Sequence, residues 1–115
     1  MIVDLSKVAV YIRPGPCDMR KAINGLSVIV AETMELDAVS GNLFLFCNKQ
    51  RRILKCLYWD RNGFCLWQKR LERDRFPWPQ TSEAAREITI DELKMLLSGI
   101  DFFRAHRELK YSAVV

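Results

Sequence analysis

The residues of this chain best suited to chemistry are its arginines and lysines, which could hold the phosphates of a nucleic acid. Nine of the 18 Lys and Arg residues, but only three of the 14 Asp and Glu residues, lie between residues 47 and 76, so this stretch has a net charge of +6. The rest of the chain has a net charge of −2, within a total of +4. This uneven distribution favours a surface that faces a polyanion. The alternative is a solvated rim, because Lys and Arg also protect exposed strand edges.

The cations of this stretch fall mainly in two groups along the chain. The segment 48–52 is polar and reads as a turn, where side chains project far enough to reach a groove or a phosphate backbone. The run from Lys69 to Arg75 adds four more cations, whose field Glu72 and Asp74 partly offset. We therefore predict DNA contacts from Lys49, Arg51, Arg52, Arg61, Lys69, Arg70, Arg73 and Arg75. Aromatic residues interleave with these cations and would suit stacking on unpaired bases, although strand alternation assigns most of them to the core.

A further phosphate contact is predicted at Arg20 and Lys21. Asp18 precedes a helical pattern that runs to Thr33 and is suited to cap its first free amide groups, while Gly25 would permit close packing on the sheet. Cations at the positive end of the helix dipole could hold an anion together with those amides. The alternative is a pair of solvated surface cations.

Catalytic and metal chemistry find little support in the composition. His106 is the only histidine, which excludes sites that need two or three. The four cysteines, Cys17, Cys47, Cys56 and Cys65, form no C-x-x-C pair, and we expect reduced, buried thiols. No glycine pattern matches a phosphate-binding loop. We predict no catalytic residue, metal, cofactor or small-molecule substrate, with an Mg²⁺-dependent nuclease that uses Asp60 as the distant alternative.

The elements that position the cations form one α+β domain. Three strand-like segments with short connections predict an antiparallel meander at residues 42–47, 53–59 and 64–71, and shorter strands at 8–12 and 84–89 would extend it to five. Alternation places Leu54, Cys56 and Tyr58 on one face and Lys55, Leu57 and Trp59 on the other. Since both faces are partly apolar, each needs a cover: two helices, or one helix and a partner protein.

The C-terminal third of the chain supplies the second helix. Phe76-Pro77-Trp78-Pro79 predicts an extended segment with an aromatic anchor, because proline cannot join a central strand. Thr89 and Glu92 match a capping box, and Gly99 ends the helix that follows. We expect the domain core to span residues 8–101. Beyond it, residues 102–115 form a tail whose partner-binding candidates are Phe102, Phe103, His106, Leu109 and Tyr111.

Several motifs occur in an order that resembles a known family: Asp18-Met19-Arg20-Lys21, Leu43-Phe44-Leu45-Phe46, Leu57-Tyr58-Trp59-Asp60, Gly63-Phe64-Cys65-Leu66-Trp67, Phe76-Pro77-Trp78-Pro79 and Leu96-Leu97-Ser98-Gly99-Ile100-Asp101. From Val8 to Tyr111 the chain resembles TnpB, the small accessory protein from the second reading frame of bacterial insertion-sequence-sixty-six-type transposons. The resemblance implies a role in DNA transposition beside a larger transposase that carries the catalytic acidic residues. It implies no catalytic residue in this chain.

Two functions follow as expectations. The first is a non-catalytic accessory protein that binds transposon-end DNA or the nucleoprotein complex through its basic meander. The alternative is a protein-interaction module that docks on the element-encoded transposase without touching DNA. We expect a cytoplasmic protein without membrane contact, because no apolar run approaches about 18 residues and the first residues do not resemble a signal peptide.

Overall fold

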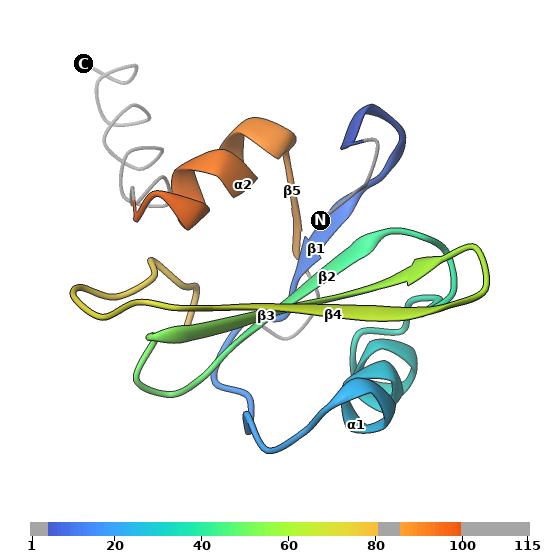
Figure 1. Cartoon of the computed structure of the whole chain (residues 1–115), viewed down its shortest axis with the longest axis horizontal. Helices are drawn as coiled ribbons and strands as arrows, with labels where there is room; N and C mark the ends of the chain where they lie inside the picture. The colour runs from blue at the N-terminus through green and yellow to red at the C-terminus, as the bar shows by residue number, and fades with distance from the viewer. Residues whose placement is uncertain (1–4, 81–85, 100–115) are drawn as a thin grey trace, which may run out of the picture.

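The computed structural model describes residues 5–80 and 86–99, and it confirms the predicted α+β class. A five-stranded sheet has the order β4-β3-β2-β1-β5 and lies between two helical segments (Figure 1). The elements are a 3₁₀ turn at Leu5–Lys7, β1 (Val10–Ile12), α1 (Ile23–Val28) continued by a π-helix (Ile29–Thr33), β2 (Leu43–Cys47), β3 (Ile53–Asp60), β4 (Gly63–Arg70), β5 (Arg86–Ile88) and α2 (Ile90–Leu97).

The predicted meander is present as β2, β3 and β4, which pair antiparallel in sequence order. The sheet is nevertheless mixed, because β1 pairs with β2 in parallel. A parallel pair requires a crossover, and the chain between these strands makes it through α1. On its other edge β1 pairs antiparallel with β5, so the second short strand is also confirmed.

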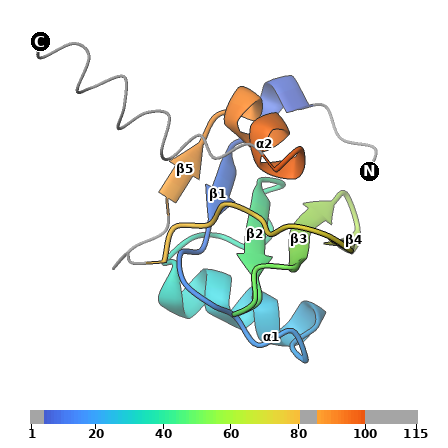
Figure 2. The ribbon, with the colours of Figure 1, turned by 90° about the vertical axis from the view of Figure 1, so that its left-hand side faces the viewer.

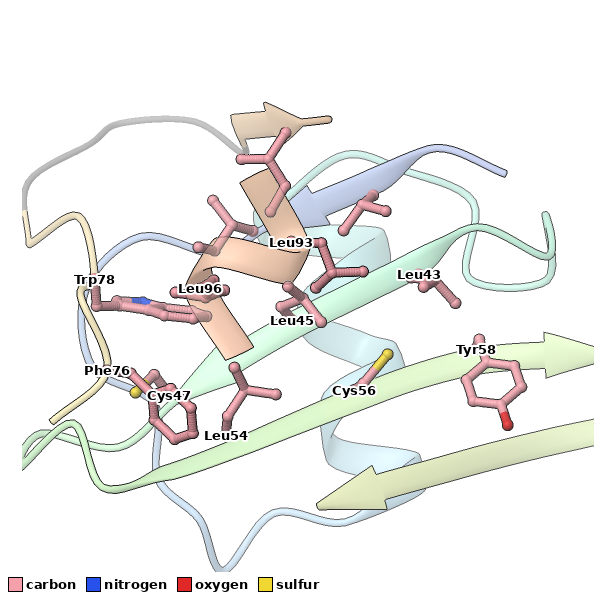
Figure 3. Close-up of a cluster of buried hydrophobic side chains, with 13 residues drawn as sticks. Leu43, Leu45, Cys47, Leu54, Cys56, Tyr58, Phe76, Trp78, Leu93 and Leu96 are labelled. Atoms are coloured by element: carbon pink, nitrogen blue, oxygen red, sulfur yellow. The ribbon is translucent and has the colours of Figure 1, made fainter. Parts of the chain in front are cut away.

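Two hydrophobic clusters lie on opposite faces of the sheet, as the alternation predicts. Leu57 of β3 packs on the α1 side with Leu26 and Val30. Leu54 and Cys56 face the α2 side together with Leu93 and Leu96, the helix residues that point onto the sheet in Figure 3. Figure 2 shows the two helices on opposite faces of the sheet. Each apolar face of the central strands is therefore covered by this chain itself.

The predicted start of the first helix is wrong. Asp18 is not its N-cap: α1 begins at Ile23 after Ala22, which makes no capping side-chain bond. The physical reason is Lys55, whose ammonium Nζ donates to the carbonyl oxygens of Met19 and Lys21, both at 2.9 Å. Those two carbonyls are thereby held outside a helical ladder. At Gly25 a Cβ would meet the side chain of Lys21 at 3.2 Å, so the close neighbour at this position is the segment before α1.

The C-terminal predictions within the described residues are confirmed. Phe76 and Trp78 are buried in the α2-side cluster, and the Trp78 indole N–H donates to the carbonyl of Arg13 at 3.0 Å. Thr89 and Glu92 form both bonds of the capping box. Gly99 follows the helix with φ +81°, a conformation that glycine adopts without strain. The predicted tail at residues 102–115 lies outside the described residues.

Candidate nucleic-acid interface

The turn between β2 and β3 is shaped by the side chain of Asn48. Its Oδ1 accepts hydrogen bonds from the backbone N–H groups of Arg52 at 2.9 Å and Ile53 at 3.1 Å. The N–H of Arg51 donates to the carbonyl of Asn48 at 3.0 Å, and Arg51 takes the left-handed conformation with φ 60°. A residue other than glycine is uncommon there, so the surrounding bonds must over-determine the turn.

The loop after β4 lies against this turn. Two main-chain hydrogen bonds join them, from the N–H of Leu71 to the carbonyl of Arg52 at 2.8 Å and from the N–H of Phe76 to the carbonyl of Arg51 at 2.7 Å. The completely buried ring of Phe76 anchors the far end of the loop. As a result, two groups of cations that are about twenty residues apart in the sequence share one end of the sheet.

We call this region the basic end, and it consists of Lys49, Arg51, Arg52, Arg70, Arg73 and Arg75. In Figure 1 the turn and the loop both lie at the left, and Figure 2 views the molecule from that end. Five of the six side chains are exposed and that of Arg51 is half-buried. The structure therefore brings together six of the eight residues that were predicted to contact DNA. They lie at one end of the sheet and not on one of its faces.

Most cations of the basic end are free of ion pairs. Within the described part of the chain, the side chains of Lys49, Arg51, Arg52, Arg73 and Arg75 make no hydrogen bond or ion pair. Arg70 pairs with Glu72 at 3.0 Å, with both side chains well exposed. An exposed pair of this kind contributes about 0–1 kcal/mol, so it holds the Arg70 guanidinium only weakly.

Lys69 has a structural role instead. Its ammonium Nζ donates to the carbonyl of Leu97 at 3.0 Å, which satisfies a free carbonyl at the C-terminus of α2 and complements the negative end of the helix dipole. Lys69 was predicted to contact DNA, but its charged group is directed at α2, and we leave it out of the basic end. Lys55 is likewise occupied, with only 8% of the residue exposed.

Arg61 lies at the opposite end of the β3–β4 hairpin. The turn at residues 61–62 and the turn at 48–52 are separated by the eight residues of β3, a length of about 26 Å at 3.3 Å per residue. Figure 1 shows the two turns at opposite ends of the sheet. The Arg61 side chain is 91% exposed and lies 3.7 Å from an Asp60 carboxylate oxygen. Within one copy of the chain, Arg61 therefore does not join the other predicted DNA contacts.

Arg20 and Lys21, the predicted phosphate contact, precede α1 instead of standing in its first turn. The N-cap position is Ala22, the residue after Lys21. Asp18 accepts a hydrogen bond from the N–H of Arg20 and pairs with its guanidinium at 2.7 Å. This pairing lowers the pKa of Asp18 to about 2. Both cations are exposed, and their contact with phosphate stays a prediction.

The aromatic residues are placed mainly as the alternation indicates. Phe76 and Trp78 are buried, while Trp59, Phe64 and Trp67 are half-buried on β3 and β4. Trp59 and Phe64 meet edge to face, with ring centroids 5.0 Å apart. None of them lies within the basic end, so a base-stacking platform is not part of this site.

Residues 5–80 and 86–99 offer little for other kinds of site. There, no group of three or more His, Cys, Asp and Glu side chains is arranged to hold a metal ion. In the same ranges no helix has the length and apolar character that a membrane span requires. The five predicted partner-binding residues, Phe102, Phe103, His106, Leu109 and Tyr111, lie outside the described ranges, and their role stays a prediction.

The fold and site define a small α+β domain with a cluster of six cations at one end of its sheet, five of which make no ion pair in the described part of the chain. Comparison with known proteins identifies its family: residues 8–107 match the family described as IS66 Orf2-like protein, and the chain belongs to it. This membership confirms the resemblance and associates the chain with transposition of an IS66-type insertion sequence in an accessory role.

Two curated relatives extend the comparison. The uncharacterized protein y4hO of Sinorhizobium fredii is 39% identical over 102 residues, which cover 89% of each chain. The uncharacterized protein y4jC of the same organism is 33% identical over 93 residues, covering 81% of this chain and 80% of the relative. No solved structure matched the chain.

Proposed function

We propose that this chain is a non-catalytic accessory protein in transposition that binds DNA through the basic end. The observation that carries the proposal is the gathering of five cations without ion pairs on two loops joined by main-chain hydrogen bonds. Phosphate backbones are bound mainly by such groups, and each phosphate neutralised releases condensed counterions from the DNA. Family membership supports the proposal, because the family is associated with an IS66-type insertion sequence, which is a DNA element.

The salt dependence of binding tests this proposal quantitatively. If the five unpaired cations each neutralise one phosphate of a duplex, the logarithm of affinity falls against the logarithm of salt concentration with a slope of about −4.5. Fluorescence anisotropy of a labelled transposon-end duplex, titrated at several salt concentrations, measures this slope. A random duplex of equal length measures how much of the binding depends on sequence.

Three variants locate the contact surface. Arg52→Gln, Arg73→Gln and Arg75→Gln each remove one exposed cation, and each should reduce the magnitude of the slope by about 0.9. Lys94→Gln is the matched control, because it removes one exposed positive charge from α2. Equal effects of all four substitutions would show a general charge effect and contradict the proposed surface. Absence of duplex binding at low salt, together with capture of the purified transposase, would favour the protein-interaction alternative.

A further inference from the structure

The outer edge of β4 is the longest unpaired strand edge among the described residues. β4 has eight residues and pairs only with β3, whereas the opposite edge of the sheet is the three-residue β5. A long free edge presents backbone donors and acceptors that suit pairing with another strand. Charges protect only its end, at Lys69 and Arg70, and the six residues Gly63–Gln68 carry none.

The apolar side chains of β4 are also incompletely covered. Phe64 and Leu66 pack against the α1-side cluster and Cys65 and Trp67 against the α2-side cluster, yet all four remain half-buried. The neighbouring strand β3 has five consecutive buried residues from Leu54 to Tyr58. Burial therefore drops abruptly at the last strand, on both faces of the sheet at once.

The register of the hairpin shows which backbone groups face outward. The N–H of Leu71 donates to the carbonyl of Arg52, which makes these residues a hydrogen-bonded pair at the end of the β3–β4 ladder. Bonded pairs alternate along an antiparallel ladder, so Cys65, Trp67 and Lys69 bond to β3. The N–H and C=O groups of the intervening residues Phe64, Leu66, Gln68 and Arg70 consequently face the free edge.

We propose that β4 pairs antiparallel with β4 of a second copy of this chain, around a two-fold axis at Trp67. Antiparallel pairing of two identical strands must place outward-facing residues opposite one another, which allows Leu66 opposite Gln68 and Phe64 opposite Arg70. Trp67 then faces Trp67 of the second copy at a closely spaced, non-hydrogen-bonded position. A cross-strand aromatic pair there contributes favourably, and Arg70 stands opposite the Phe64 ring of the second copy, within reach of a cation–π contact.

The charge distribution of β4 agrees with a second copy as the occupant. Its cations stand at one end of the strand and its uncharged residues at the other, so an antiparallel arrangement keeps the two Lys69–Arg70 segments apart. It also brings the turn that carries Arg61 of the second copy beside the loop at residues 71–75, which holds the carboxylates of Glu72 and Asp74. The pairing would join two five-stranded sheets into one, with a basic end at each extremity.

Sedimentation velocity of the full chain, over micromolar to submillimolar concentrations, is the first test, and a dimer is expected. Gln68→Pro should convert it to a monomer with an unchanged circular dichroism spectrum. The Gln68 N–H faces the free edge, so the proline removes no bond to β3. A wild-type chain that stays monomeric overturns the proposal, and so does a Gln68→Pro variant that remains dimeric.

Disulfide cross-linking tests the register. Trp67→Cys places two thiols at a closely spaced pair, with Cβ atoms about 4.5 Å apart, and should form an intermolecular disulfide that mass spectrometry assigns to position 67. Gln68→Cys is the matched control, because its symmetry mate lies two residues along the partner strand. Position 68 is the more exposed, so random collision would favour it. Faster cross-linking of Gln68→Cys than of Trp67→Cys overturns the proposed pairing about Trp67.

Discussion

Replacement of Lys55 by methionine tests how the segment before α1 is held. Lys55 lies on β3 between two completely buried residues, and its ammonium makes two hydrogen bonds of 2.9 Å to main-chain carbonyls of Met19 and Lys21. Methionine keeps most of the length of the lysine stem and its apolar contacts but cannot donate. The substitution therefore removes the two bonds without opening a large cavity.

Three contributions determine how much Lys55→Met should lower the free energy of unfolding. A hydrogen bond from a charged donor contributes about 1.5–3 kcal/mol, so two such bonds set an upper bound of roughly 6 kcal/mol. The actual loss in the free energy of unfolding is smaller, because methionine carries no ammonium that has to be removed from water on folding. Both hydrogen bonds are only partly buried, so water can hydrate the released carbonyls. We expect a net loss of about 2 kcal/mol, which lowers the midpoint of thermal unfolding by about 8 °C in a domain of this size.

Urea unfolding followed by circular dichroism measures this loss, with Lys49→Met in the exposed turn as the control for removing a lysine. Hydrogen exchange adds a local measurement. The N–H of Cys17 donates to the carbonyl of Cys47 and that of Lys21 to the carbonyl of Asp18, and both amides should exchange faster in Lys55→Met. A variant as stable as Lys49→Met, with unchanged exchange at these amides, would refute the role given to the ammonium.

Three further predictions concern single groups. Thr89→Ala removes the hydroxyl that caps α2 and should cost about 1 kcal/mol of the free energy of unfolding, measured by urea titration; a loss near zero would show that the cap is dispensable. Arg20 lowers the pKa of Asp18 from 3.8 to about 2. This pair therefore stabilises the fold at pH values above 3.8, and its contribution is lost as the pH falls through about 2. Arg20→Ala should move the Asp18 titration, followed by carboxyl carbon NMR, back toward 3.8, and an unmoved titration would contradict this cause. Burial raises the pKa of the Cys56 thiol to about 12. Alkylation of the native protein at neutral pH should therefore modify the half-buried Cys65 well before Cys56, as measured by peptide mapping. Equal rates of modification at the two thiols would contradict this prediction.

Local patterns predicted the elements and the faces of the strands. Alternation is a property of neighbouring residues, so the assignment of Leu54 and Cys56 to one face and Leu57 to the other needed no knowledge of distant contacts. The capping box of α2 is equally local, because Thr89 and Glu92 are three residues apart. The parallel pairing of β1 with β2 was not predicted, since strand order depends on how the whole chain packs.

The position of Arg61 could have been predicted from the sequence. Successive turns of a meander lie at opposite ends of its strands, so a meander with turns at 48–52 and 61–62 already separates Arg61 from the other cations. The net charge of residues 47–76 does not show that its cations lie at two opposite ends of the sheet. Cations that are close in the sequence can therefore be far apart in space when an eight-residue strand separates them.

The structural roles of Lys55 and Lys69 depend on contacts with distant parts of the chain. Lys55 bonds to carbonyls 34 and 36 residues away, and Lys69 bonds to a carbonyl 28 residues away. For Lys55 the sequence does carry one signal, a lone lysine on an otherwise apolar strand face. A buried ammonium on such a face must find acceptors, and here those acceptors determine where α1 begins.

The two main-chain bonds between the turn at 48–52 and the loop at 71–75 fix the spacing of the backbone segments from which these charged side chains project. A polyanion that meets this end finds backbone already ordered, and association restricts only the rotamers of long side chains. The Cα atoms that carry these side chains thus keep a constant spacing, which the residues of a flexible basic tail do not. Under the proposed function, this spacing would favour polyanions whose successive phosphates match it over others of equal charge density.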